Sequence, residues 1–424
     1  MSRFRRTLSM AALSLFAAGC TKDLVCNTGE TVCDGQCVNL SVDPENCSTC
    51  GHACGNGETC QAGLCCQGGL CPAGIYVACF ESGEVQGATV SPIAPVGVAA
   101  NVPYVTSLAW SATSSILWAV PGYEESGAYA LSTGLSGLTT AGQVPIPVVS
   151  SAGLTYVAAN GSLLYVSDDD TNSVVVIGPA TTTPGIVGDV ANLPSGFSPY
   201  GIAFSGNTGY VALVNYTTGS SQIAVFDVAS QEVTGAIDMS TLGNKPGGAQ
   251  PQRLLVAGNR LYVTLQNLDP TNQYAPAGDG LLAVVDTSAN ALVPGVNPVD
   301  LGGSCQDPYG LALYGNKLYV TCGFLPFTGS GVQGAGVVPV DVSGPAPLVL
   351  PAISTAGLTP APFFAPGPIA FCGDFGYIGD QQFGYVLRLD PSASASLTAS
   401  QVPLCNAGPL GGSYVGLNDI HCAP

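Results

Sequence analysis

Few side chains in this sequence are suited to acid–base or nucleophilic chemistry. The chain contains two histidines, His52 and His421, and a serine–histidine–aspartate triad would have to use one of them. No Gly-x-Ser-x-Gly segment, the usual setting of a serine nucleophile in α/β-hydrolases, occurs in the chain. We therefore assign no catalytic residue. His421 is expected to be a structural residue near a strand end or, with Asp419, part of a ligand site.

Arg253 is a candidate for binding a ligand. It ends the segment Pro251-Gln252-Arg253, whereas two similar segments read Pro199-Tyr200-Gly201 and Pro308-Tyr309-Gly310. Arginine thus replaces a glycine that would let strands approach closely, and it adds a fixed positive charge.

Two interpretations of Arg253 stay open. In the first, Arg253 binds an anionic molecule together with Asp419 and His421. In the second, it forms an ion pair with a carboxylate such as Asp307 or Asp269, because ion pairs at protein surfaces are common.

A triple carboxylate is the only candidate metal site that the sequence indicates. Asp168, Asp169 and Asp170 are followed by Thr171 and Asn172. Three carboxylates can bind calcium, but the alternating spacing of a loop that wraps one ion is missing. An Asx-rich turn is the alternative interpretation. We expect no other cofactor.

The candidates lie among short β-type runs that repeat along residues 72–424. A core of an aromatic residue between small or aliphatic ones recurs at intervals of roughly 40–60 residues, the period of four-stranded propeller blades. The cores are Ile75-Tyr76-Val77, Leu117-Trp118-Ala119, Leu164-Tyr165-Val166, Gly209-Tyr210-Val211, Leu261-Tyr262-Val263, Leu318-Tyr319-Val320 and Gly376-Tyr377-Ile378.

Most cores have a second apolar run before them and a third, often ending in Asp, after them. The first core lacks a preceding run, and the last run, at 414–421, lacks a following core. Together these two segments would complete one blade and leave no exposed sheet edge. The sequence therefore predicts an all-β fold: a seven-bladed β-propeller closed by pairing of its N- and C-terminal strands, with a small disulfide-rich N-terminal domain.

The repeats resemble the YVTN family of bacterial β-propellers, whose strands read much like Leu261-Tyr262-Val263-Thr264. This resemblance covers residues 72–424 and implies the fold more than the function. Two function classes follow from it: a non-enzymatic binding or scaffold module, which we favour, and a lactonase-like hydrolase that uses the propeller channel. The second class requires carboxylates, Asn or His to converge in the channel.

The first residues have the pattern of an export signal. Arg3, Arg5 and Arg6 precede a short apolar stretch that cannot span a bilayer. The segment Ala17-Ala18-Gly19-Cys20 resembles a bacterial lipobox, which implies lipidation of Cys20, and Thr21 implies an outer-membrane destination. Ordinary cleavage, with Cys20 left as a thiol, is the alternative. The total of 17 cysteines is odd, so lipidation of Cys20 would leave an even number for disulfides.

Residues 26–71 contain ten of the cysteines, so this segment must be held together by disulfides. The spacing in Cys33-Asp-Gly-Gln-Cys37 and in Asn46-Cys47-Ser-Thr-Cys50-Gly51 resembles the stigma-specific cysteine-rich family over about residues 33–66. Zinc binding by Cys47 and Cys50, and haem attachment next to His52, are less consistent with an exported, cysteine-dense segment. The sequence leaves the pairing within this segment open.

Six cysteines lie in the propeller repeats. Cys305 precedes the first strand of a blade and Cys322 ends the next strand, so the two should lie on the same face. The same argument pairs Cys79 with Cys405 and leaves Cys372 to pair with Cys422. A Cys79–Cys422 bond is the alternative.

Composition limits the partners. The net charge is −18 with 8% charged residues, which excludes nucleic acid and anionic lipid surfaces. Hydrophobic content is 46%, which excludes a disordered chain. We expect a signal peptide at 1–19, a cysteine-rich domain at 20–71 and the propeller at 72–424, attached to the cell envelope through the lipid and binding an unidentified ligand or protein.

Overall fold

The computed structural model forms two compact units, Met1–Cys65 and Cys66–Pro424. This division falls a few residues before the boundary at 71/72 expected from the sequence. The structure describes residues 26, 30–40, 42–47, 49–61, 64–67, 73–122, 127–134, 136–147, 153–178, 184–326, 332–359, 364–392, 395–406 and 415–423. Cys20 and the signal segment lie outside them.

The N-terminal unit is held by disulfides and short hairpins. Strand β1 (Thr31–Cys33) pairs with β2 (Gln36–Val38), and β3 (Glu58–Gln61) pairs with β4 (Leu64–Gln67). Four disulfides between its described cysteines cross-link it: Cys26–Cys37, Cys33–Cys50, Cys47–Cys60 and Cys54–Cys65.

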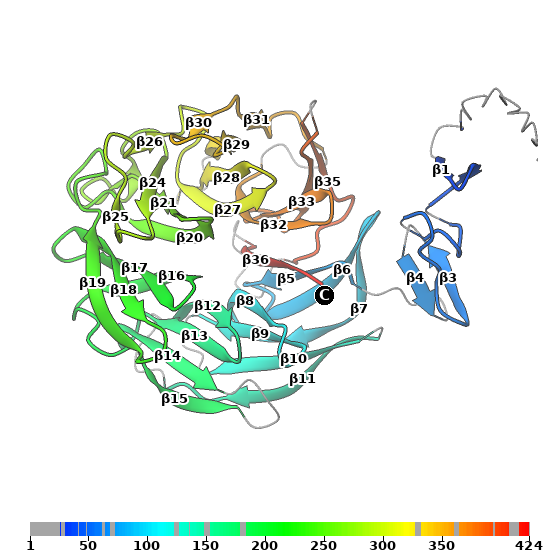
Figure 1. Ribbon diagram of the computed structural model, residues 1–424, viewed down its shortest axis with the longest axis horizontal. Coiled ribbons are helices and arrows are strands. Elements are labelled where there is room, and N and C mark those ends of the chain that lie inside the picture. Colours follow the sequence, from blue (N-terminus) through cyan, green and yellow to red (C-terminus); the bar gives the residue numbers. More distant parts are fainter. Residues whose placement is uncertain are drawn as a thin grey trace, which may run out of the picture. The chain divides into compact units, whose positions relative to one another are not determined.

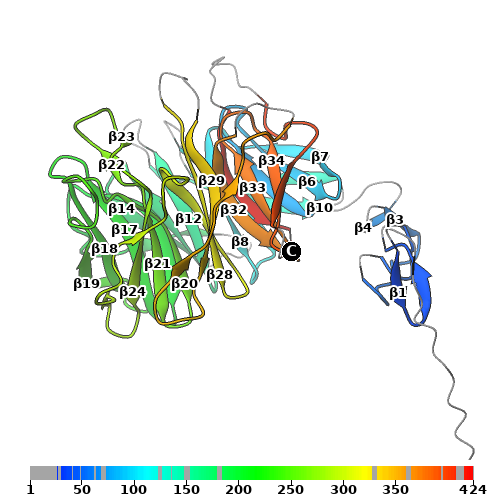
Figure 2. The ribbon, with the colours of Figure 1, turned by 90° about the horizontal axis from the view of Figure 1, so that it is seen from above.

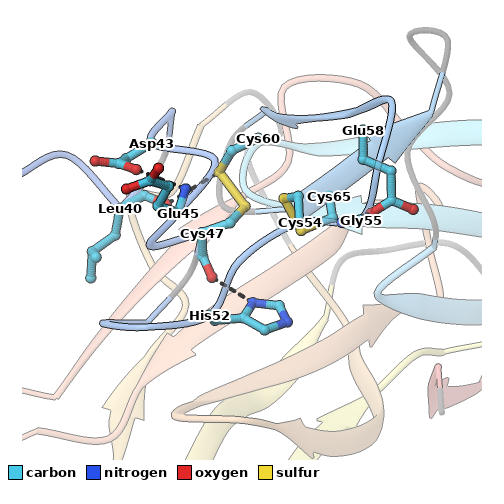
Figure 3. Close-up of a disulfide and its surroundings, with 10 residues drawn as sticks. All are labelled: Leu40, Asp43, Glu45, Cys47, His52, Cys54, Gly55, Glu58, Cys60 and Cys65. Carbon is cyan, nitrogen blue, oxygen red and sulfur yellow. Dashed lines mark hydrogen bonds between the residues drawn. A yellow bond between two sulfur atoms is a disulfide. The ribbon is translucent and has the colours of Figure 1, made fainter.

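Figure 3 shows two of these bonds, and the imidazole Nδ1 of His52 lies 2.7 Å from the carbonyl oxygen of Cys47. Cys47 and Cys50 belong to different disulfides, so they cannot bind zinc together. The prediction of a disulfide-rich segment is confirmed.

The larger unit is built from antiparallel sheets that correspond to propeller blades, and the all-β prediction is confirmed (Figures 1 and 2). Three of the sheets contain four strands in chain order. They are β12 (Leu154–Asn160), β13 (Leu163–Asp168), β14 (Ser173–Gly178) and β15 (Gly185–Asp189); β16 (Ser198–Ser205), β17 (Thr208–Asn215), β18 (Ser220–Asp227) and β19 (Glu232–Asp238); and β32 (Pro366–Cys372), β33 (Phe375–Asp380), β34 (Val386–Asp390) and β35 (Ser396–Ala399).

Two sheets have a divided fourth strand. They comprise β20 (Pro251–Ala257), β21 (Arg260–Leu265), β24 (Leu281–Asp286), β25 (Ala291–Leu292) and β26 (Val299–Asp300); and β27 (Pro308–Tyr314), β28 (Lys317–Phe324), β29 (Gln333–Asp341), β30 (Leu348–Val349) and β31 (Ile353–Ser354). A separate small hairpin, β22 (Leu268–Asp269) with β23 (Ala275–Pro276), follows β21.

The first and last strands of the larger unit meet in the remaining, eight-stranded sheet. Its strands are β36 (Leu417–Cys422), β5 (Ile75–Cys79), β6 (Glu84–Val90), β7 (Ile93–Asn101), β8 (Val105–Ser111), β9 (Ile116–Pro121), β10 (Ala128–Gly134) and β11 (Gly137–Val144). Strand β36 pairs with β5, with Ile420 opposite Val77, as predicted for the last and first runs. Figure 1 shows the red β36 beside the blue β5. The parallel contact of β7 with β11 joins two four-stranded halves.

The repeated aromatic residue packs between neighbouring blades. Tyr165 is fully buried, and its ring centroid lies 4.9 Å from that of Phe204 in the next sheet. Tyr319 likewise lies 5.0 Å from Phe371 of the following sheet. Because each aromatic residue fills the space between two sheets, the repeat stabilises the ring and not just a single blade.

The inner strand of each blade contains a β-bulge. In every case two residues of the inner strand face a single residue of its partner strand. The bulged pairs are Thr106–Ser107, Thr155–Tyr156, Tyr200–Gly201, Gln252–Arg253, Tyr309–Gly310, Gly367–Pro368 and Asn418–Asp419. Bulges redirect side chains and increase twist, and here they lie side by side, because each inner strand packs against the next and β36 packs against β8.

Among the described residues of the propeller repeats, three disulfides are formed: Cys79–Cys405, Cys305–Cys322 and Cys372–Cys422. These are the pairs expected from the strand positions, and the alternative bond between Cys79 and Cys422 is not formed. In the described part of the chain, no helix has the length and apolar character needed to cross a membrane.

Candidate functional site

The bulges surround a cavity of about 200 Å³ at the centre of the ring. Its walls come from β8, β12, β16, β20, β27 and β36, so residues distant in sequence meet there. The lining residues are Thr106, Thr155, Tyr156, Tyr200, Gly201, Gln252, Arg253, Tyr309 and Asn418. We call this the Arg253 cavity.

Arg253 is clamped between two tyrosine rings. The centre of its guanidinium lies 4.7 Å from the ring centroid of Tyr156 and 4.9 Å from that of Tyr309. Its Nη2 atom donates a hydrogen bond of 3.1 Å to the hydroxyl of Tyr309 and one of 3.5 Å to the carbonyl oxygen of Asn418. The Tyr309 hydroxyl also donates to that carbonyl, at 3.2 Å. These contacts fix the orientation of the charged group.

The alternative interpretation, an ion pair of Arg253 with Asp307 or Asp269, is wrong because neither pair is formed. Asp269 instead lies 3.8 Å from Lys245, and Asp307 accepts a hydrogen bond of 2.8 Å from Nε2 of Gln266. Within the described ranges, the ion pairs are Lys245–Asp269 and Arg260–Asp286. The direct partners of Arg253 are therefore neutral groups.

The two tyrosines do not neutralise the arginine. Burial raises the pKa of Tyr156 and of Tyr309, and the charge of Arg253 opposes this rise only in part. Both side chains are consequently neutral phenols at pH 7, while a guanidinium is always protonated. Arg253 is therefore the one charged side chain among the described lining residues, and the nearby Asp419 carboxylate interacts with it electrostatically.

Asp419 and His421 do not join Arg253 in the cavity lining. The Asp419 carboxylate accepts hydrogen bonds from Ser107 Oγ and from the Leu108 amide, each 2.8 Å long, so it connects β36 to β8. The Nδ1 atom of His421 lies 2.8 Å from the carbonyl oxygen of its neighbour Cys422. The charge of Asp419 nevertheless acts on Arg253 and on the two tyrosines beside it. The grouping of Arg253, Asp419 and His421 in one ligand site stays a prediction.

Sequence analysis missed Tyr156 and Asn418 as cavity residues. Both belong to bulged pairs, and neither segment has the Pro-x-x spacing that drew attention to Arg253. Tyr200 and Tyr309 stood in the compared segments, but they were not recognised as lining residues. The bulges that bring these four residues to the cavity are defined by strand pairing, which the linear sequence does not show.

The aspartates 168–170 form a turn in which the Asp168 carboxylate accepts hydrogen bonds from backbone amides. Its Oδ1 accepts from the amides of Asp170 and Thr171 at 3.0 and 3.3 Å, and its Oδ2 accepts from the Thr171 hydroxyl at 2.7 Å. In the described part of the chain, the only group of three potential metal ligands within 4.8 Å of one another is Cys47, Cys54 and Cys65. All three sulfurs belong to disulfides. The geometry at 168–170 is that of an Asx turn, and calcium binding there stays a prediction.

Comparison with known proteins supports both parts of the architecture. Residues 14–68 match the stigma-specific STIG1-like protein family. No curated protein matches the sequence.

Among solved structures, the periplasmic gluconolactonase PpgL of Pseudomonas aeruginosa is similar, with a TM-score of 0.58 and 14% identity over 78% of this chain and 97% of that one. A protein of Lactobacillus plantarum has the same score and identity over 82% and 99%. A hypothetical selenium-binding protein of Sulfolobus tokodaii has a TM-score of 0.58 and 11% identity over 83% and 93%.

The larger unit is similar to lactonase-like and YVTN-like propellers. At these identities the similarity establishes the fold alone, since one propeller fold serves many functions. The function has to be argued from the Arg253 cavity.

Proposed function

We propose that this protein is a non-enzymatic binding module whose Arg253 cavity holds a small organic carboxylate. The observation that carries the proposal is the guanidinium of Arg253, which is held between Tyr156 and Tyr309 and forms no ion pair with a carboxylate in the described part of the chain. A fixed, planar donor of this kind matches the two oxygens of a carboxylate.

The size and lining of the cavity agree with a small ligand. A volume of about 200 Å³ is below that of most drug-sized pockets, and Thr106, Thr155 and Tyr200 line it together with the arginine. The Thr106 and Thr155 hydroxyls donate to backbone carbonyl oxygens, so toward a ligand they can accept a hydrogen bond from the hydroxyl group of a short hydroxy acid.

The chemistry of the lining favours binding over the alternative, a lactonase-like hydrolase. Hydrolysis needs a general base or a nucleophile near the scissile bond. The described lining residues include no Asp, Glu, His or Cys, and the nearby Asp419 is engaged by Ser107 and Leu108.

The proposal includes the setting of the module. Counting the eight-stranded sheet as two blades, we infer a ring of seven blades closed by β36 and β5. We further propose that the chain is exported, lipidated at Cys20 and held at the outer membrane of a bacterial envelope, where its many disulfides would be stable. The net charge of −18 supports the absence of nucleic-acid partners.

Titration calorimetry with acetate, lactate, glycerate and succinate would test the function. We expect at least one of these acids to bind, and Arg253→Gln to weaken that binding at least about tenfold, because a charge-assisted hydrogen bond is lost. Tyr309→Phe should weaken binding less. Arg260→Gln removes an arginine that pairs with Asp286 and serves as the control for net charge.

Two results would overturn the proposal. One is equal affinity of the parent and Arg253→Gln proteins for every acid. The other is turnover of a sugar lactone by the parent that Arg253→Gln abolishes, which would establish the hydrolase.

A further inference from the structure

A second cavity, of about 430 Å³, is connected to the Arg253 cavity by hydrogen bonds. Gln252 donates to Gln266 at 2.9 Å, and Gln266 donates to Asp307 at 2.8 Å. The hydroxyls of Tyr200 and Tyr216 lie 2.7 Å apart. The cavity is lined by Tyr216, Gln250, Gln266, Leu268, Tyr274, Asp307, Phe324 and Leu325. We call it the Asp307 cavity.

Two neighbouring inner strands direct Gln250 and Asp307 to this cavity. Gln250 immediately precedes β20, and Asp307 immediately precedes β27. Both have left-handed backbones, with φ of +41° and +51°, which costs energy for a residue other than glycine. The chain thus holds both side chains at equivalent positions of adjacent blades.

Two hydrogen-bond acceptors lie in the lining of this cavity, the amide oxygen of Gln250 and the carboxylate of Asp307. Gln250 is 1% exposed, and its Nε2 donates to the carbonyl oxygen of Gly247 at 3.0 Å. Its Oε1 is buried and has no hydrogen-bond partner among the described residues. Leaving such an acceptor unpaired is costly. Asp307 lines the same cavity, and one of its carboxylate oxygens accepts from Gln266.

Aromatic rings form another wall. The rings of Tyr216 and Tyr274 meet edge to face with centroids 5.9 Å apart, and Phe324 lies in the same lining. Aromatic faces attract cations and also cover alkyl chains.

We propose that the Asp307 cavity binds the ammonium group of a primary alkylamine. Such a group brings three N–H donors, enough to satisfy both Gln250 Oε1 and Asp307, and its positive charge compensates the carboxylate. A quaternary ammonium would leave Gln250 unpaired, and a neutral saccharide would leave the carboxylate uncompensated. The inference does not depend on the function proposed for the Arg253 cavity.

Calorimetry on the full exported chain with n-butylammonium chloride at pH 7.5 tests the proposal. The parent protein should bind this cation, and Asp307→Asn should weaken binding at least about tenfold. Gln250→Met, which removes the unpaired acceptor, should weaken it several-fold. Glu232→Gln, which removes an equal charge from the exposed start of β19, should leave the affinity unchanged. Arg253→Gln should also leave it unchanged, which separates this site from the carboxylate site.

Tetramethylammonium and methyl glucoside distinguish the alternatives. We expect both to bind more weakly than n-butylammonium. Tetramethylammonium binding as tightly would show that an aromatic surface alone attracts cations, and saturable binding of methyl glucoside that Asp307→Asn abolishes would establish a saccharide site. Either result overturns the proposal, as does an unchanged n-butylammonium affinity in both the Asp307→Asn and the Gln250→Met proteins. Melting curves of both variants verify that they fold.

Discussion

The carboxylate of Asp419 and the hydroxyl of Ser107 are 2.8 Å apart, although 312 positions separate the two residues in the sequence. The same Asp419 oxygen accepts the amide of Leu108, and Ser107 Oγ in turn accepts the amide of Val157 at 3.3 Å. Three consecutive inner strands, β36, β8 and β12, are joined in this way. Asp419 therefore connects the closing strand to its neighbour.

Asp419→Ala is expected to lower the free energy of unfolding by about 1–3 kcal/mol, because the buried Ser107 hydroxyl and the Leu108 amide lose their acceptor. Urea unfolding measures this change. Ser107→Ala alone should cost less, and the double variant should cost less than the sum of the single ones, since both remove one hydrogen bond. Additive costs would contradict the connection.

Removing the Cys79–Cys405 disulfide should destabilise the propeller more than removing Cys305–Cys322. The two bonds close sequence separations of 326 and 17 residues, and the chain-entropy model predicts a difference of about 2–3 kcal/mol. Paired Cys→Ala variants compared by urea unfolding measure it. Equal losses would indicate that native-state contacts, and not loop closure, determine the contribution of each bond.

Stability should fall as the pH rises from about 4 to 6. Burial raises the pKa of two carboxyl groups, Asp307 and Asp380, from the usual 3.8 to about 6. At Asp307 the hydrogen bond from Gln266 opposes this rise in part. Between those values the folded protein binds protons that the unfolded chain has lost, so protonation stabilises the fold and ionisation removes that stability. For the fully buried Asp380 the effect is on the order of 1–3 kcal/mol.

Asp307→Asn should make the pH dependence shallower, because one of the two groups no longer titrates. The titratable groups near Asp307 are the phenols of Tyr216 and Tyr309, whose pKa values are raised and which stay neutral in this range. Urea midpoints at pH 4.5, 5.5 and 7 measure the slope. A parent protein that becomes more stable between pH 4.5 and 7 would contradict the assignment.

Cys20→Ala should release the protein from the membrane to the soluble fraction after export, because the lipid is the only attachment that we propose. Fractionation of cells and immunoblotting measure the distribution. Parent protein that is already soluble after export would refute lipidation at Cys20.

Local sequence patterns determined the elements and several of their pairings. The aromatic residue of each repeat is an example. Tyr165 and Tyr319 are buried between sheets, because burying their rings removes apolar surface from water. The pairing of Cys305 with Cys322 was also predictable, because hairpin geometry relates the start of one strand to the end of the next.

The site depended on the tertiary structure. Composition and spacing identified Arg253, but not its clamp between Tyr156 and Tyr309, which come from two other sheets. Likewise, the sequence drew attention to Asp419, but not to the hydrogen bonds by which it joins β36 to β8. A bulge shifts the register by one residue and so decides which of two adjacent side chains faces the cavity, and ring closure decides which strands are neighbours. Both depend on contacts between distant segments, so the sequence determined the fold class and its repeating core, while the assembled ring decided the environment of each charged residue.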